Sequence, residues 1–260
     1  MARVSWKENR VLNIETRKGV FVVGQMLKHP YIRFYNMFST ESTLHNVNTM
    51  KLSVLFTAAV TRQYLRCSRI SVLKDAVPDI RKTDSNTWIN QYPGSRKVVA
   101  YQGDDQEINC VILGHKPGGM LVKKDLWWSP TPEQPLRTHI SGVFDEVICA
   151  DIPLEANDII DRYELTGMCV FPYTNERLYL CSLYNKSLDP YKDLVFNRSL
   201  PKEYSLAIKI ISGGTDAKQR KEILNTYFTD STELNFKSRQ EPHLVRLHRT
   251  ALIKADSFVM

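Results

Sequence analysis

Histidine and cysteine are the residues whose spacing says most about metal chemistry in this sequence. His243 and His248 lie five positions apart, whereas two zinc ligands on one helical face lie four apart, with a glutamate beside the first. The five cysteines are scattered and contain no CxxC pair. The spacing therefore predicts core or surface histidines and buried thiols, with no metal site and no cofactor.

An acid–lysine pair is the sharpest candidate for catalysis. Asp216 and Lys218 follow the apolar run 206–211, and Asp193 or Glu203 lies upstream. Carboxylates on adjoining strands could hold Mg²⁺ while the lysine assists the attacking water, as in a nuclease. An acid placed directly after two glycines is, however, also the expected cap of a helix. We therefore expect no enzyme and keep a Mg²⁺-dependent nuclease as the alternative.

Aromatic and basic residues alternate between Tyr31 and Tyr35. In a nucleic-acid-binding sheet this pattern would form a stacking platform. In an ordinary two-sided strand, Ile32 and Phe34 face the core, Arg33 faces out and the tyrosines are half-buried. Core packing is the favoured interpretation, and a basic nucleic-acid-binding protein stays an alternative.

The composition describes a folded chain with excess positive charge. Hydrophobic residues make up 43% of the chain, and the formal net charge is +7. Acids interrupt the basic residues, which indicates a mixed-charge surface able to attract an acidic partner. The apolar stretch 52–60 is too short to span a bilayer, and no apolar run near the start resembles a secretory signal. Because the thiols also favour a reducing compartment, we expect a cytoplasmic protein without membrane contact.

Hydrophobic patterning in the first part predicts a small sheet and a helix. Apolar, β-branched runs at Val11–Ile14, Val20–Leu27 and Tyr31–Asn36 predict antiparallel strands. Gly24 falls inside the second run, which predicts a strongly curled meander. From Thr49 to Arg66, apolar residues recur every three or four positions, so this segment is expected to be an amphipathic helix.

The rest of the chain has strand and helix signals on both sides of a proline-rich linker. The linker is Ser129–Leu136. The other expected elements are strands at 70–73, 97–101, 108–113, 143–149 and 206–211, a helical turn at 156–162, a hairpin of 167–172 with 178–184, and a helix at 216–228.

Together these elements predict an α+β fold dominated by antiparallel sheet, with two main helices at 49–66 and 216–228. The linker divides the chain into residues 1–128 and residues 137–260, each β-rich and the second with a late helix. One continuous domain is the alternative. The run Gly167–Pro172 and the following strand echo the opening of the chain, and a duplication would make the halves two curled β units.

Short motifs follow one another in a fixed order through the first part of the chain. They are the apolar strand 11–14, a turn with Gly19, the strand Val20–Leu27, the aromatic strand Ile32–Tyr35, and the runs Leu55–Val60 and Ile70–Leu73 before Val77-Pro78. This order resembles bacterial polymorphic-toxin immunity protein family 26. Two motifs depart from it: Asn9-Arg10 stand where the family has Gly-Asp, and Ser68-Arg69 where it has a tryptophan.

The resemblance implies a cytoplasmic immunity protein of a contact-dependent growth-inhibition system. Such a protein binds and neutralises a toxin domain delivered by a neighbouring bacterium, through a protein–protein interface that needs no catalytic residue. A positively charged inhibitor further implies a toxin with an acidic surface patch.

Two groups of residues are the candidate partner-binding site. Arg62, Arg66 and Arg69 recur at spacings of four and three, so they are expected to share one face near the end of the 49–66 helix. Trp127 and Trp128 are adjacent between prolines, and two adjacent side chains of a strand cannot both point into the core. The alternative for the arginines is a structural role, in which their charge complements the C-terminus of the helix. The alternative for the tryptophans is packing against a loop.

Overall fold

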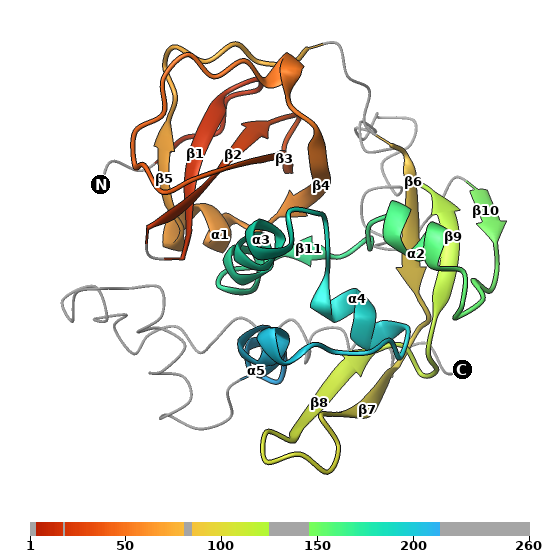
Figure 1. The fold of residues 1–260 in the computed structure, drawn as a ribbon. Helices are drawn as coiled ribbons and strands as arrows, with labels where there is room; N and C mark the ends of the chain where they lie inside the picture. The colour runs from red at the N-terminus through yellow and green to blue at the C-terminus, as the bar shows by residue number, and fades with distance from the viewer. Residues whose placement is uncertain (1–3, 18, 81–84, 125–145, 214–260) are drawn as a thin grey trace.

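The computed structural model of the chain describes residues 4–17, 19–80, 85–124 and 146–213 (Figure 1). The fold is α+β, as predicted, with one six-stranded sheet, two smaller antiparallel sheets and short helices between them. Residues 125–145 and 214–260 lie outside the described residues, and with them the linker Ser129–Leu136 and the expected helix 216–228. The division of the chain into two halves therefore stays a prediction.

The six-stranded sheet contains the first five strands of the chain. Its order is β11-β4-β3-β2-β1-β5, antiparallel throughout except where β11 joins β4 in parallel. The bounds are β1 Val11–Arg17, β2 Val20–Met26, β3 Tyr31–Ser39, β4 Val54–Val60, β5 Arg69–Val72 and β11 Met168–Cys169. The predicted meander of β1, β2 and β3 and the predicted strand β5 are confirmed.

Gly24 lies where the sheet curls most tightly. The β2–β3 register shifts between Val22 and Gly24, which marks a bulge. A Cβ atom on Gly24 would lie 2.9 Å from Ile14 Cδ1 and 3.3 Å from Ile32 Cγ2. The glycine thus lets side chains of the two neighbouring strands close over β2, as its position within the run predicted.

The helix expected at 49–66 is wrong. A 3₁₀ turn at Thr49–Lys51 is followed by strand β4, and only Arg62–Cys67 forms a helix, α1. In β4, Phe56, Ala58 and Val60 share the face packed on the main core, which is the period of a strand. The β-branched and aromatic content of this segment outweighed its accidental three- and four-residue spacing.

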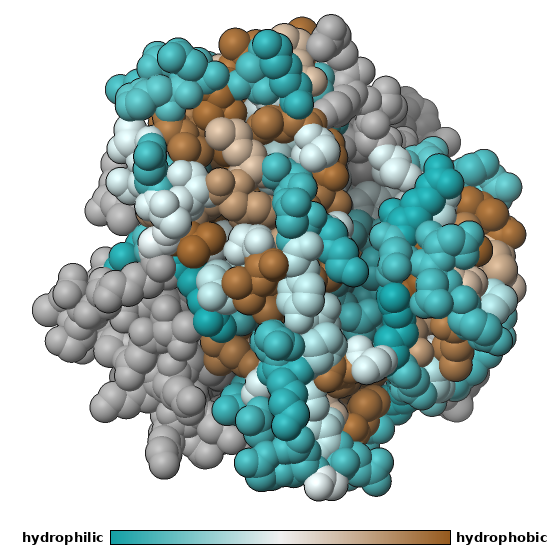
Figure 2. Space-filling model, in the orientation of Figure 1, coloured by the Kyte–Doolittle hydropathy of each residue, from teal (hydrophilic) through white to brown (hydrophobic). Residues whose placement is uncertain are grey.

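Two smaller sheets occupy the middle of the chain. β10 (Glu146–Cys149), β9 (Gly119–Lys123) and β6 (Thr87–Gln91) form one, while β7 (Ser95–Ala100) and β8 (Ile108–Leu113) form the other. The strands predicted at 97–101, 108–113 and 143–149 correspond to β7, β8 and β10. Val147 and Ile148 of β10 are exposed, and Figure 2 shows hydrophobic residues gathered on this side of the molecule.

Helices replace two predicted strand regions in the second half. The helices are α2 Asn157–Arg162, α3 Tyr173–Tyr184, α4 Pro190–Val195 and α5 Ser205–Ile211. The turn at 156–162 is confirmed, but the hairpin of 167–172 with 178–184 and the strand 206–211 are wrong. A short apolar run does not distinguish a strand from a fully buried helix. No helix of the described residues is long and apolar enough to span a membrane.

Both faces of the six-stranded sheet are covered. Leu12, Ile14 and Phe34 belong to a core shared with α3, α4 and α5, whereas Tyr35 packs with Val11 and Val23 on the opposite face. Tyr31 and Tyr35 are therefore buried in packing, and no stacking platform is exposed at this strand.

The outward orientation expected for Arg33 is also wrong. Its side chain is buried, and Nη1 donates to the carbonyl oxygen of Asp79 and to the Tyr35 hydroxyl at 3.4 Å each. The chain around Asp79 thus covers this face of β3, where the Tyr35 hydroxyl also donates to Gln25 Oε1 at 2.9 Å.

Candidate functional site

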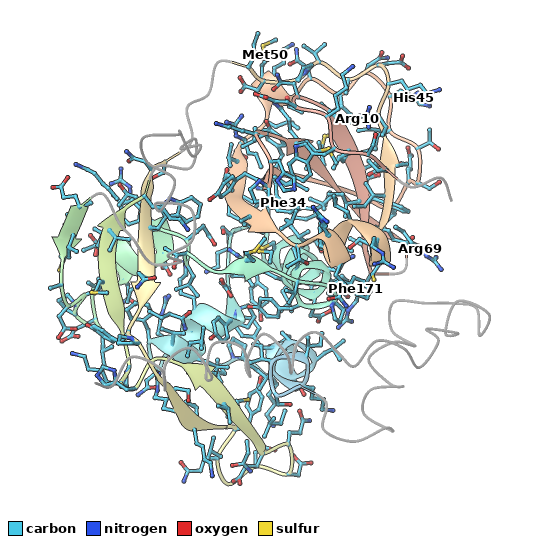
Figure 3. The ribbon with its side chains drawn as sticks, turned by 180° about the vertical axis from the view of Figure 1, so that it is seen from behind. Arg10, Phe34, His45, Met50, Arg69 and Phe171 are labelled. Carbon is cyan, nitrogen blue, oxygen red and sulfur yellow. The ribbon has the colours of Figure 1, made fainter. Side chains whose placement is uncertain are left out.

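Two of the three predicted arginines lie on one exposed helix. Arg62 and Arg66 are one turn apart on α1, and both are exposed. Arg69 instead begins β5 and lies partly buried, at the same end of the sheet as Phe171 (Figure 3). Trp127 and Trp128 lie outside the described residues. The structure therefore brings Arg62 and Arg66 together and gives Arg69 a different environment.

Local contacts hold α1 in place. Thr61 caps its N-terminus by accepting a hydrogen bond from the Tyr64 amide at 3.2 Å. Tyr64 points away from the arginines into the core, where its ring meets Phe34 edge-on at 6.4 Å. Since the buried tyrosine fixes the rotation of this short helix, the opposite side of α1 presents Arg62 and Arg66 to solvent.

Ion pairs neutralise the cations at the base of this helix. Arg69 lies opposite Glu15 in the β1–β5 ladder, with Nη1 3.6 Å from the carboxylate. Arg17 binds the buried carboxylate of Glu176 with two nitrogens, at 2.6 and 2.8 Å. Asn175 of α3 donates to the backbone oxygen of Glu15 at 2.7 Å. The sheet edge and α3 are thus joined into one rigid support.

The charges of Arg62 and Arg66 have no counterpart in this support. Neither arginine forms an ion pair with another of the described residues. Burial raises the pKa of the neighbouring Cys67 thiol, and the positive charge of Arg66 opposes that shift. We define the pair Arg62 and Arg66 on α1 as the arginine face. Its two charges, unpaired within the described part of the chain, suit a surface that attracts an anionic partner.

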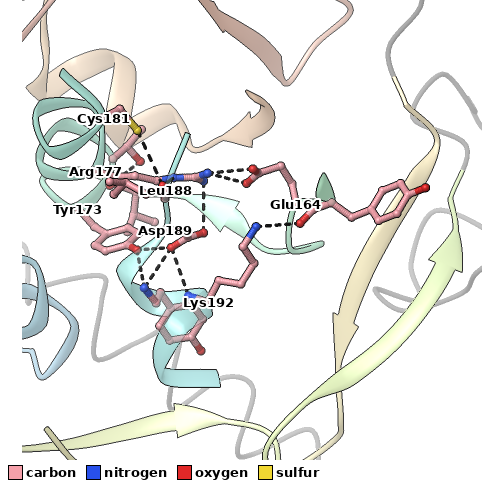
Figure 4. Close-up of polar contacts among 11 residues, drawn as sticks. Glu164, Tyr173, Arg177, Cys181, Leu188, Asp189 and Lys192 are labelled. Atoms are coloured by element: carbon pink, nitrogen blue, oxygen red, sulfur yellow. Dashed lines mark hydrogen bonds and ion pairs between the residues drawn. The ribbon is translucent and has the colours of Figure 1, made fainter. Parts of the chain in front are cut away.

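A buried charge cluster around Arg177 escaped the sequence analysis (Figure 4). Its Nη2 lies 2.8 Å from Glu164, its Nη1 lies 3.3 Å from Asp189, and its Nε donates to Leu188 O at 2.7 Å. The guanidinium also lies over the Phe56 ring of β4, 3.6 Å from the centroid. One side chain of α3 therefore connects the large sheet, the α3–α4 turn and the segment after α2.

The carboxylates control the ionisation of this cluster. Burial by itself would lower the pKa of Arg177, but Asp189 and Glu164 hold it well above its ordinary value. Asp189 also caps α4 by accepting from the Tyr191 and Lys192 amides at 3.0 and 3.3 Å. Because Arg177 is only 2% exposed, we assign the cluster to holding the helices in place, not to binding a partner.

The sequence contained one signal for this cluster. Asp189 directly before Pro190 is the usual pairing of a helix cap with proline in the first turn. That pairing marks the start of α4, but it does not show which cation lies beside the cap. Arg177 lay between the two strands of the predicted hairpin, and only the helix α3 brings it beside Asp189 and Glu164.

The acid–lysine hypothesis loses its expected geometry. The segment 206–211 that was to supply a strand is helix α5, and Asp216 and Lys218 lie outside the described residues. Within the parts of the chain that the structure describes, no group of three or more His, Cys, Asp or Glu side chains is arranged to hold a metal ion.

Asp193 on α4 makes stability depend on pH. Burial raises its pKa to about 6, and the nearby Arg198, 3.2 Å away, only partly opposes the shift. A carboxyl whose folded pKa exceeds its unfolded value stabilises the fold while protonated, and this contribution is lost as the pH rises through 6. The neighbouring charges are Asp189, Lys192 and Asp161.

Replacing Asp193 by asparagine should therefore remove this pH dependence. Relative to the wild type, the free energy of unfolding of Asp193→Asn should rise by about 1 kcal/mol between pH 5 and pH 7.5. Urea denaturation at both pH values measures the difference. Asp158→Asn, an exposed change on α2, is the control. If the free energies of unfolding of Asp193→Asn and the wild type differ by the same amount at both pH values, the assignment is contradicted.

A family model described as a domain of unknown function (DUF8309) matches residues 1–127. No curated protein and no solved structure matches the chain significantly. The family match includes strands β1 to β9 and the arginine face, while helices α2 to α5 lie beyond it. Over its first part, the chain is similar to that family.

Proposed function

We propose that this chain is a cytoplasmic immunity protein that binds and neutralises a toxin domain delivered by a neighbouring bacterium. Its partner is a protein with an acidic surface patch, and neutralisation occurs by docking without catalysis. The activity follows from shape and charge complementarity to one cognate partner.

The resemblance to immunity protein family 26 supports this proposal. The motifs that carry it correspond to β1, β2, β3, β4 and β5, which are neighbours in the six-stranded sheet. They are thus parts of one folded unit and not isolated hydrophobic runs. The helix α1 that bears the arginine face connects the last two of these strands.

The arginine face is the observation that carries the proposal. Arg62 and Arg66 are exposed on a helix fixed by Tyr64, next to two arginines that carboxylates already neutralise. The planar guanidinium makes several hydrogen bonds for each side chain that is ordered, and arginine is enriched among residues that dominate protein interfaces. An acidic protein surface complements this arrangement.

Rescue from a toxin tests the proposal directly. A candidate toxin domain, taken from the genes that neighbour this one, is expressed in a sensitive host, alone and together with the full chain. Growth arrest by the toxin alone and normal growth with the chain are the expected results. The purified proteins should also form a complex of fixed stoichiometry in size-exclusion chromatography.

Two outcomes would overturn the proposal. One is continued growth arrest when the chain is present at the level of the toxin. The other is a mobility shift of duplex or single-stranded nucleic acid at low salt, with affinity falling steeply as salt rises, in place of toxin binding. The second result would assign the chain to nucleic acid.

A further inference from the structure

A cavity of about 600 Å³ follows the outer edge of strand β7. Every residue from Arg96 to Tyr101 lines it, and Leu194, Arg198 and Leu200 form the opposite wall. The Tyr101 hydroxyl donates to Pro201 O at 2.8 Å and holds the strand end to the segment after α4. We define this cavity as the β7 groove.

The β7–β8 register shows which backbone groups face the groove. Hydrogen-bonded and non-bonded pairs alternate along an antiparallel ladder, and the carbonyl oxygen of Leu113 accepts from Gln91 Nε2 at 3.3 Å, away from β7. The pair Ser95–Leu113 is then not hydrogen-bonded, and the Leu113 amide indeed donates to the Tyr191 hydroxyl at 3.2 Å, away from β7.

It follows that Lys97 and Val99 direct their N–H and C=O groups away from β8. These groups have no hydrogen-bond partner among the described residues. An unpaired edge of this kind can bind another extended backbone. That backbone would form hydrogen bonds with the two N–H and two C=O groups of Lys97 and Val99.

The side chains around the groove restrict what can bind. Arg96 uses its terminal nitrogens in four hydrogen bonds to backbone carbonyl oxygens, and Arg198 binds the Asp161 carboxylate at 2.6 Å. Neither guanidinium therefore has two adjacent N–H donors available to bind a small anion. Lys97 is exposed, forms no ion pair with any of the described residues, and is the cation left for a ligand.

We propose that the β7 groove binds an extended peptide segment of a partner protein, which adds a strand to the free edge of β7. Its backbone pairs with Lys97 and Val99. An acidic side chain opposite Lys97 lies on the outer face, and alternate apolar side chains contact Leu194 and Leu200. None of the described residues that line the groove carries a carboxylate, which complements the acidic residue.

This interaction goes beyond the proposed toxin neutralisation, because it involves a different surface. The arginine face attracts a folded acidic surface through side-chain charge, whereas the β7 groove recognises extended backbone. The two also belong to different elements, since the arginine face lies on helix α1 and β7 belongs to a separate two-stranded sheet. Either surface can therefore fail its test while the other passes.

Selection from a displayed library of random twelve-residue peptides tests the inference, with the full chain as bait. We expect enriched peptides with alternating apolar residues and a central acid. Val99→Pro removes an outward N–H without breaking a β7–β8 hydrogen bond, so it should weaken these peptides at least about tenfold. Val99→Thr keeps the N–H and should bind within about twofold of the wild type.

Two further readouts keep the test decisive. When the Lys97→Glu variant is the bait, the selected peptides should carry a basic residue in place of the acid. In the wild-type chain, a selected peptide should protect the Lys97 and Val99 amides from hydrogen exchange, a measurement that stands if the proline variant fails to fold. Peptides that tolerate Val99→Pro, or leave these amides unprotected, would overturn the proposal, as would a library that yields no binder. None of these results bears on toxin rescue.

Discussion

Replacing Arg177 by methionine is expected to lower the free energy of unfolding by about 3–5 kcal/mol. The guanidinium is the cation that lies against the side chains of both Glu164 and Asp189 inside the Arg177 cluster. Methionine has similar length and fills the space over Phe56, but it leaves two negative charges buried without that counter-ion. The predicted loss is thus electrostatic and not a result of an unfilled cavity.

Denaturation by urea at neutral pH, followed by circular dichroism, measures this change. Arg162→Met is the matched control, because Arg162 is exposed on α2 and the same substitution there should change stability by no more than about 0.5 kcal/mol. Arg177→Lys keeps one charge but loses the two-sided contact and should give an intermediate loss. A loss below about 1 kcal/mol for Arg177→Met would contradict the role assigned to the cluster.

The second large effect is expected from reversing the charge of the arginine face. The double change Arg62→Glu and Arg66→Glu should slow association with the toxin domain about tenfold or more at low ionic strength. The difference should shrink as salt is added, because exposed charges act over a screened distance. The fold should be unaffected, since neither side chain is buried or paired with another described residue.

Stopped-flow mixing of the two purified proteins over a range of salt concentrations gives the association rates. Lys51→Glu with Lys74→Glu is the control, because it changes the net charge equally at other exposed positions. The control should slow association much less. Equal rates for the wild type and the arginine double variant would exclude the arginine face from the toxin interface.

Several elements could be predicted because local sequence and tertiary structure agree in them. In β1 to β3 and in the β7–β8 hairpin, β-branched runs alternate with glycine or polar turns, and neighbours in sequence are also neighbours in the sheet. The bulge at Gly24 and the turn α2 were predictable for the same reason. The four-residue spacing of Arg62 and Arg66 sufficed to place both on one side of α1, even though the long helix around them was wrong.

The tertiary structure alone decided the segments that are buried on several sides. The runs at 178–184 and 206–211 are apolar and short, and such a sequence satisfies a strand or a buried helix equally well. Packing against the large sheet, together with the contacts of Arg17 with Glu176 and of Arg177 with Asp189, selected the helix in α3. Arg17 and Glu176 lie far apart in the sequence, and the pairing of Arg177 with Asp189 depends on the turn between α3 and α4, so neither contact could be inferred from local sequence.

The β7 groove likewise could not be predicted in full from the sequence. The sequence by itself placed a strand at 97–101, close to the observed bounds of β7 at Ser95–Ala100, while the acidic partner expected from the net charge of +7 stays a prediction. It could not determine that one edge of this strand stays unpaired beside Leu194 and Leu200, because strand order and the groove wall depend on residues about a hundred positions away. Long-range contacts therefore decided which backbone groups remain available to a partner.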